Sequence, residues 1–149
     1  MVRTRLLSTH IAAVAAWLGA NFVQYALGGR FAAEGAAIDA AWTRQSAWLG
    51  RRYYNAAGVL IGITGVLLVL DGGWSWGSGF IWVGAAVVVI GGLMGGLVFV
   101  PLSERRAAEL DAGEQSAAGS TRSMLLRSVT VDTALVLLAV LAMVDKWQA

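Results

Sequence analysis

The chain has 149 residues, of which 58% are apolar and 13% charged, and its net charge is +2. Soluble domains are nearer about 45–50% apolar and about 25% charged, so this composition is typical of an integral membrane protein with the lipid bilayer as a partner. The absence of cysteine excludes disulfides, iron–sulfur clusters and thiolate metal sites. Basic residues never form a run longer than two, so no nucleic-acid partner is indicated.

Four apolar stretches, residues 6–27, 54–70, 80–100 and 124–144, follow one another along the chain. Each is close to the about 20 residues that a helix needs to cross the hydrocarbon core. Backbone polar groups in lipid must be satisfied within the segment, so such stretches predict helices. We therefore expect an all-α integral membrane protein, a single domain over residues 1–149 with a bundle of four transmembrane helices. The first stretch exceeds the about 7–15 apolar residues of a signal peptide, so we expect a retained helix.

The distribution of basic residues predicts the orientation of the bundle. The two longer connections and the start of the fourth helix carry eight arginines: Arg30, Arg44, Arg51, Arg52, Arg105, Arg106, Arg122 and Arg127. The other side carries three basic residues, Arg3, Arg5 and Lys146. Because basic residues concentrate in cytoplasmic loops, we expect the longer connections in the cytoplasm, both termini outside, and the chain in the plasma membrane.

The longer connections have patterns of their own. Residues 28–53 show a helical period, which predicts an amphipathic helix lying on the membrane surface between the first and second transmembrane helices. The positions that recur at this spacing are Phe31, Ile38, Trp42, Gln45 and Leu49. Residues 111–123, DAGEQSAAGSTRS, predict a flexible loop, with Ser120 or Thr121 placed to cap the fourth helix.

Five polar residues within the apolar stretches fall at similar depths: Asn21, Gln24, Asn55, Ser128 and Asp132. At 1.5 Å per residue, Asn21 lies about 9 Å and Asp132 about 12 Å above the cytoplasmic boundary. An aspartate within the membrane is costly unless it faces the bundle interior and finds partners, so we expect a polar cluster there. Two roles stay open: hydrogen bonds that hold the helices together, or a site for an ion, a proton or a ligand.

His10 stands about two turns before Trp17 on the same face of the first helix. Near the outer boundary its imidazole can hydrogen-bond a neighbouring helix or interfacial water. Alternatively it can be an axial ligand of haem b, with Trp17 against the macrocycle. With one histidine, no cysteine and four methionines, a closed metal site within one chain is not expected, and the identity of any metal stays open.

Small residues mark the faces where helices can approach one another closely in lipid. The second stretch has Gly58, Gly62 and Gly65 along one side, and the third has Gly84, Gly91, Gly92, Gly95 and Gly96. One interpretation is tight packing inside a single bundle. The other is the interface of a homodimer, or of a larger membrane complex, because the glycines of the third helix cover more than one face.

Three segments, HIAAVAAWLG, AWLGRRYYNAAGVLIGITGVLLVLDGGWSWG and VDTALVLLAVLAMVDKW, resemble small four-helix bacterial membrane proteins of the copper-resistance D (CopD)-like superfamily. The resemblance covers most of the chain and is closest to a branch without a defined function, with a more distant similarity to a haem-binding group of the HemJ type. It implies a four-helix fold and two activities, copper uptake and haem-linked redox chemistry of the protoporphyrinogen-oxidase kind. The matching positions are His10, Trp17, Gly19, Thr64, Gly65 and Asp132.

Three functions are compatible with these features. The first is a membrane protein that binds haem, a porphyrin or another small ligand through His10. The second is a small oligomeric transporter or channel for an ion, a proton or a solute, with Asp132, Asn21 and Asn55 along the path. The third is a non-catalytic accessory subunit of a larger membrane complex. Hydrolase activity is not favoured, because the carboxylates are mostly surface charges and no histidine is expected beside a nucleophile.

Overall fold

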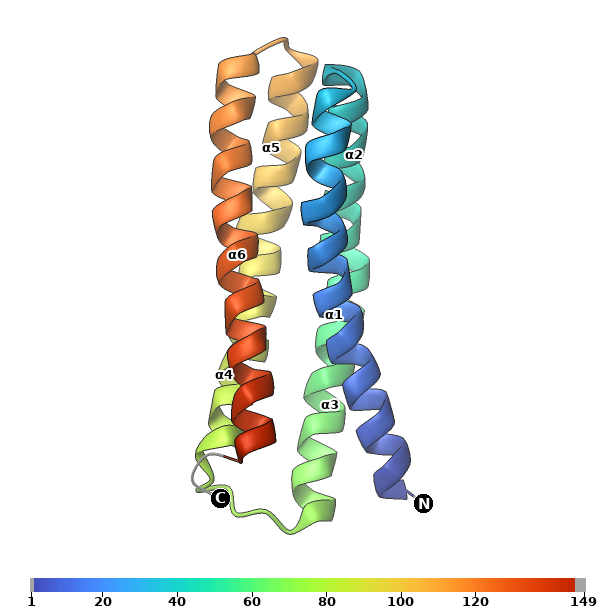
Figure 1. Cartoon of the computed structure of the whole chain (residues 1–149), viewed down its shortest axis with the longest axis vertical. Helices are drawn as coiled ribbons and strands as arrows, with labels where there is room; N and C mark the ends of the chain where they lie inside the picture. Colours follow the sequence, from blue (N-terminus) through green and yellow to red (C-terminus); the bar gives the residue numbers. More distant parts are fainter. Residues whose placement is uncertain (1, 147–149) are drawn as a thin grey trace.

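In a computed structural model, which describes residues 2–146, the chain forms long helical segments along one axis (Figure 1). The helices are α1 (Val2–Ala33), α2 (Ala36–Leu49), η1 (Gly50–Tyr54), α3 (Asn55–Gly72), α4 (Gly79–Met94), η2 (Gly95–Phe99), α5 (Val100–Asp111) and α6 (Gln115–Asp145). The elements η1 and η2 are π-helical turns that join α2 to α3 and α4 to α5 without a break. No strand occurs among these residues, so the prediction of an all-α fold is confirmed.

Within residues 2–146, four segments are long and apolar enough to cross a membrane: Val2–Ala33, Ala36–Gly72, Gly79–Asp111 and Gln115–Asp145, with 32, 37, 33 and 31 residues. At 1.5 Å per residue these segments are about 46–56 Å long, whereas the hydrocarbon core is about 30 Å thick. Each predicted apolar stretch lies inside one segment, and the polar ends of the segments extend beyond it. The helices therefore fit a multi-pass membrane protein.

The two ends of the bundle differ in their charge. The start of α1 and the end of α6 lie together at one end, referred to below as the terminal end (Figure 1). At the opposite end, α1 is followed by α2 and α5 by α6. This arginine-rich end carries Arg30, Arg44, Arg105, Arg106 and Arg122. Which end faces the cytoplasm stays a prediction from the count of basic residues.

The orientation predicted for the surface helix is wrong. A helix does form there, α2, but it runs along the bundle axis and packs against α1 and α5 (Figure 1). Its buried residues are Asp39, Ala40, Thr43 and Ala47, while Ile38 of the predicted apolar face is 45% exposed. An amphipathic pattern is satisfied by another helix as well as by a membrane surface. Here the uninterrupted passage through η1 into α3 holds α2 upright.

The flexible loop predicted over residues 111–123 is also wrong. Only residues 112–114 separate α5 from α6, and the turn places Gly113 at a φ of 77°. Ser120 and Thr121 therefore lie inside α6 instead of capping it. The hydroxyl of Thr121 donates to Glu109 Oε2 at 2.7 Å. A run of small and polar residues favours a loop in isolation, but packing against α5 keeps this segment helical.

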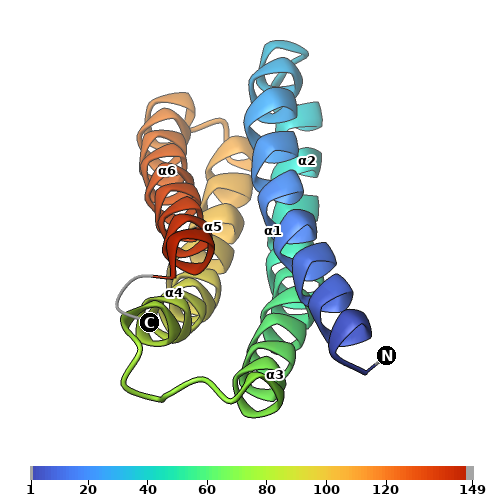
Figure 2. The same ribbon diagram turned by 60° about the horizontal axis from the view of Figure 1, so that its bottom comes forward.

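The bundle has two layers, which Figure 2 shows from the terminal end: α1 beside α2 and α3, and α6 beside α4 and α5. The apolar core lies between the layers and consists of Ala13, Trp17, Ala57, Ile61, Val87, Val136 and Ala139. Outward-facing side chains are apolar as well, since Leu97 is 72% and Val144 74% exposed. A large exposed apolar surface of this kind fits contact with lipid.

The glycines predicted to pack the helices fall into two groups, apart from Gly84, where a Cβ would lie 2.5 Å from Met143 Cε. A Cβ at Gly58 would lie 3.0 Å from Trp17 Cζ3, one at Gly91 2.9 Å from Trp17 Cζ2, and one at Gly65 3.4 Å from His10 Cε1. In the described chain, no neighbour would come closer than 4.0 Å at Gly62, Gly92, Gly95 and Gly96. The first group thus makes room for Trp17 and His10. A homodimer or a larger complex that uses the second group stays a prediction.

Candidate functional site

Asp132, on α6, is 2% exposed and faces the interior of the bundle. Two donors on α1 bind the same carboxylate oxygen: Trp17 Nε1 donates to Oδ2 at 2.9 Å, and Asn21 Nδ2 donates to it at 2.8 Å. The other oxygen, Oδ1, accepts no hydrogen bond within residues 2–146. No fully enclosed polar side-chain atom in that range lacks a partner, so Oδ1 is open to the adjacent cavity.

Asn21 has two further hydrogen-bond partners, one on α6 and one on η1. Its Nδ2 also donates to Thr133 Oγ1 at 3.0 Å, and its Oδ1 accepts the hydroxyl proton of Tyr54 at 2.7 Å. The ring of Tyr54 packs edge-on against Trp17, with 5.4 Å between the ring centroids. These contacts orient both donors toward Asp132, so the geometry of the site depends on α1, η1 and α6 together.

A cavity of about 270 Å³ begins at Asp132 and extends toward the arginine-rich end. Ligand cavities have volumes of about 300–1,000 Å³, so this one suits a small molecule. Aromatic residues form part of its wall: Trp17, Tyr25, Trp42, Tyr54 and Phe99. Its far end is lined by Arg106 and Arg122. The cavity is therefore acidic at one end and basic at the other, and between them it is lined mostly by apolar and aromatic side chains, with Gln24 among them.

The π turns determine which side chains reach the cavity. A π turn shifts the faces of the residues that follow it, and such turns often occur at functional sites. In η1 it presents Tyr54 to Asn21, whereas the next residue, Asn55, is exposed and donates to the carbonyl of Arg51 at 2.9 Å. A Cβ at Gly50 would lie 2.8 Å from Val100 Cγ2, so glycine allows the two π-containing segments to approach.

The structure brings together only part of the predicted polar cluster. Asn21 and Asp132 are in contact, and Gln24 lines the same cavity. Asn55 points away, and Ser128 is half-buried without a hydrogen bond to these residues. The predicted cluster left out the donor role of Trp17 and the contact of Tyr54. Trp17 and Asn21 are about one helical turn apart, so a partner of Asn21 lies within reach of Trp17. This spacing could have predicted that Trp17 belongs to the cluster.

His10 lies in a separate site near the terminal end and is 7% exposed. Its Nδ1 is hydrogen-bonded to Thr64 Oγ1 at 2.9 Å, and the Thr64 hydroxyl also lies 2.5 Å from the carbonyl oxygen of Leu60. The adjacent cavity is about 30 Å³, room for about one or two waters. A porphyrin there requires the helices to separate. Haem binding through His10 stays a prediction that this geometry does not favour.

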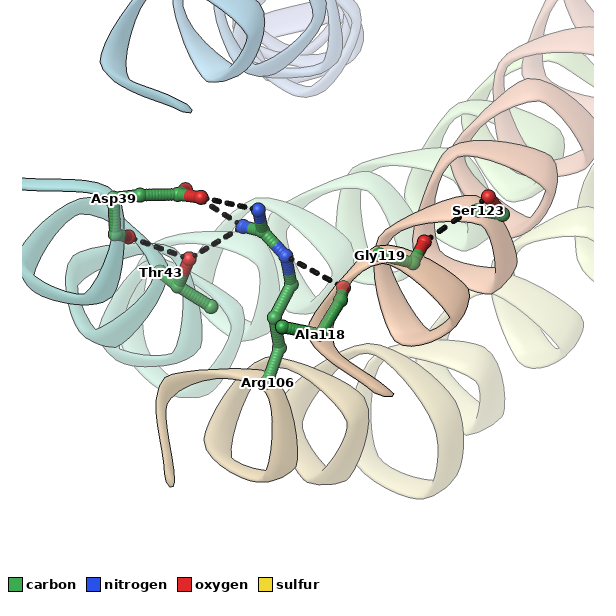
Figure 3. A network of polar contacts seen from close by, with 6 residues as sticks. All are labelled: Asp39, Thr43, Arg106, Ala118, Gly119 and Ser123. Carbon is green, nitrogen blue, oxygen red and sulfur yellow. Dashed lines mark hydrogen bonds and ion pairs between the residues drawn. The ribbon is translucent and has the colours of Figure 1, made fainter. Parts of the chain in front are cut away.

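The arginine-rich end of the cavity contains a buried ion pair (Figure 3). Arg106 Nη1 donates to Asp39 Oδ1 at 2.8 Å and to Thr43 Oγ1 at 2.9 Å, while Nη2 donates to Asp39 Oδ2. Nε donates to the carbonyl of Ala118 at 3.3 Å. The side chains of Arg106 and Asp39 are 7% and 5% exposed. This network ties α2, α5 and α6 together beside the cavity.

Two other kinds of site can be assessed from the described residues. The stretch GWSWG, residues 73–77, has the spacing of a hydrolase nucleophile elbow. It joins two helices, however, and Ser75 Oγ accepts a hydrogen bond from the amide of Gly77 at 3.1 Å, while His10 pairs with Thr64. Residues 2–146 also contain no group of three or more His, Cys, Asp and Glu side chains that would hold a metal ion.

Fold and cavity together define a class: an all-α protein with four membrane-length apolar helices and a buried carboxylate at the base of an internal cavity. The chain matches no model of a known protein family, no curated protein and no solved structure. The resemblance to the CopD-like superfamily, with the copper and haem chemistry that it implies, therefore stays a prediction, and the function has to be inferred from the site itself.

Proposed function

We propose that the protein binds a small organic cation, an amine, in the cavity at Asp132 and carries it across the membrane. The observation that supports this function is the state of the Asp132 carboxylate. One oxygen is held by Trp17 and Asn21, while the other is open to a cavity of about 270 Å³. Ionisable residues within a membrane are costly, and they often mark the path of a substrate or an ion.

A purely structural role accounts less well for this arrangement. A carboxylate that only holds helices together is expected to use both oxygens, because an unpaired polar atom in lipid costs free energy. Here both donors bind Oδ2, and the donors themselves have further support from Thr133 and Tyr54. The network thus holds Oδ1 free, as a site for a cationic ligand requires.

The chemistry of the wall favours an organic cation over a metal ion. Divalent cations such as Ca²⁺ take about six to eight oxygen ligands, whereas this site offers one open carboxylate oxygen. An ammonium group needs few acceptors and also interacts favourably with the faces of aromatic rings. Trp17, Tyr54 and Phe99 line the cavity, and Trp17 is in contact with Asp132 itself. One carboxylate among aromatic rings therefore matches an amine.

Binding is tested by calorimetry with benzylamine on the full chain in lipid nanodiscs, with benzyl alcohol as the neutral analogue. Asp132→Asn keeps the shape of the side chain and removes its charge. We expect about tenfold to about 100-fold weaker binding of benzylamine, since hydrogen bonds to charged groups contribute about 1.5–3 kcal/mol. Asp71→Asn is the matched control, because Asp71 is exposed and lies outside the cavity lining.

Transport is tested by uptake of labelled benzylamine into proteoliposomes. We expect uptake with the unchanged chain and with Asp71→Asn, and loss of uptake with Asp132→Asn. Equal binding of benzylamine by Asp132→Asn and the unchanged chain contradicts the proposed site. Binding without uptake contradicts the transport part and leaves a binding protein.

A further inference from the structure

The cavity has a second polar region, opposite Asp132. Thr43, Ser103, Arg106 and Arg122 line it, and together they are referred to as the basic pole. Arg106 is neutralised by Asp39. Three arginines outside the basic pole also have a carboxylate partner, in the pairs Arg44–Asp111, Arg51–Glu104 and Arg105–Glu109. Of the two arginines of the basic pole, Arg122 is the one that has no such partner within residues 2–146.

Arg122 has no acidic partner within residues 2–146, although it lines the cavity and is half-buried. Its Nη2 lies 3.5 Å from the position of a Cβ on Gly29, so the guanidinium rests against the glycine backbone of α1. A guanidinium keeps its charge and presents a fork of donors that matches a carboxylate or a phosphate. Arg122 thus supplies uncompensated positive charge at this end of the cavity.

Ser103 provides a second, independent indication of a ligand at the basic pole. The residue is 4% exposed, and its hydroxyl has no hydrogen-bond partner within the described chain. Because every fully enclosed polar side-chain atom there is satisfied, the hydroxyl of Ser103 is open to the cavity that it lines. A buried hydroxyl without a partner is costly unless a ligand or water binds it.

The two poles stand at a distance that a chain-like molecule can bridge. Along α6, Arg122 and Asp132 are separated by about 15 Å at 1.5 Å per residue. The side chains of α6 that line the cavity between them are apolar: Leu125, Leu126 and Val129. Along α6, the cavity wall therefore passes from the basic Arg122 through an apolar section to the acidic Asp132.

We propose that the ligand is bipolar, with an ammonium group at Asp132, an apolar middle section, and a carboxylate at Arg122 and Ser103. The assignment of the ammonium group to Asp132 rests on the proposed function, whereas the assignment of the ligand carboxylate rests on the basic pole alone. A terminal-amino fatty acid is the simplest molecule of this class. Its two charges pair with Asp132 and Arg122, neither of which has an ion-pair partner within residues 2–146. Its methylene chain lies against the apolar section.

The test compares two matched series by calorimetry on the full chain in phosphatidylcholine nanodiscs. The first contains the terminal-amino acids aminobutanoate, aminohexanoate and aminooctanoate, and the second butylamine, hexylamine and octylamine. We expect the unchanged chain to prefer the longer amino acids over the matching amines by about tenfold or more, as for a charge-assisted hydrogen bond. Aminobutanoate, which is too short to reach both poles, should gain least.

Variants assign the preference to the basic pole. Arg122→Gln should remove the preference for the amino acids and leave the affinity for the amines unchanged. Arg127→Gln, the same substitution at an exposed position of α6 outside the cavity lining, should keep the preference. Ser103→Ala should reduce the preference by less than Arg122→Gln, because the hydroxyl carries no charge.

Three outcomes separate the possibilities. Equal affinity of the unchanged chain for amino acids and amines overturns the bipolar ligand and leaves the amine site intact. Binding of octanoate that depends on Arg122, with no amine binding at Asp132, overturns the proposed function but supports a carboxylate site at the basic pole. If phosphatidylglycerol in the nanodiscs abolishes the preference, Arg122 binds lipid headgroups, and the bipolar ligand is overturned.

Discussion

The indole of Trp17 donates a hydrogen bond of 2.9 Å to the carboxylate of Asp132 across 115 residues of sequence. The same indole lies between Gly58 and Gly91, which leave no room for a side chain beside it. The position of the ring therefore determines which carboxylate oxygen is occupied and which is open to the cavity. A change in the glycines should act on the site through Trp17.

Substitution of Gly91 tests this coupling. The Cβ in Gly91→Ala would lie 2.9 Å from Trp17 Cζ2 and 3.2 Å from Asp132 Oδ1. We expect a loss of about 1–3 kcal/mol in the free energy of unfolding, as for other overpacked positions, together with weaker benzylamine binding. Gly92→Ala has nothing within 4 Å and should change stability by less than about 0.5 kcal/mol. Unfolding in mixed micelles with SDS measures both, and equal stability would contradict the packing.

The buried ion pair of Asp39 and Arg106 should contribute far more to stability than the exposed pairs. Asp39→Asn or Arg106→Gln leaves an uncompensated buried charge, which costs about 3–5 kcal/mol. Arg44→Gln breaks a pair whose side chains are 52% and 58% exposed, and it should cost about 0–1 kcal/mol. The same unfolding measurement compares the three variants. If Asp39→Asn costs no more than Arg44→Gln, the network of Figure 3 is not formed as described.

A further prediction concerns His10 and decides the haem hypothesis. In the compact site, His10→Ala removes the bond to Thr64 and should lower stability by about 1–3 kcal/mol, with a similar effect of Thr64→Val. The protein purified from haem-replete cells should show no Soret band in its absorption spectrum, oxidised or reduced. A Soret band that disappears in His10→Ala would instead support haem ligation and an opening of the bundle at His10.

The polar stripe on the first helix illustrates how far the residues alone predict the site. The depths of Asn21 and Asp132 predicted a shared cluster, and the two side chains are in contact. The depth of a residue in the membrane does not say which way its side chain faces. The prediction therefore missed Tyr54 and included Asn55. The π turn in η1 makes that choice, because it changes which of two consecutive residues faces inward.

By itself, the sequence determined that the chain forms helices of membrane length and that their polar residues fall at matching depths. These properties are local, since they depend on the length of apolar stretches and on the helical period. Only the tertiary structure decided that α2 stands upright, that Arg106 pairs with Asp39 across 67 residues, and that one oxygen of Asp132 is open to a cavity. Each of these features depends on which helices are neighbours and how closely they approach. An amphipathic or charged pattern can be satisfied by several partners, so the pattern alone does not specify which partner is used.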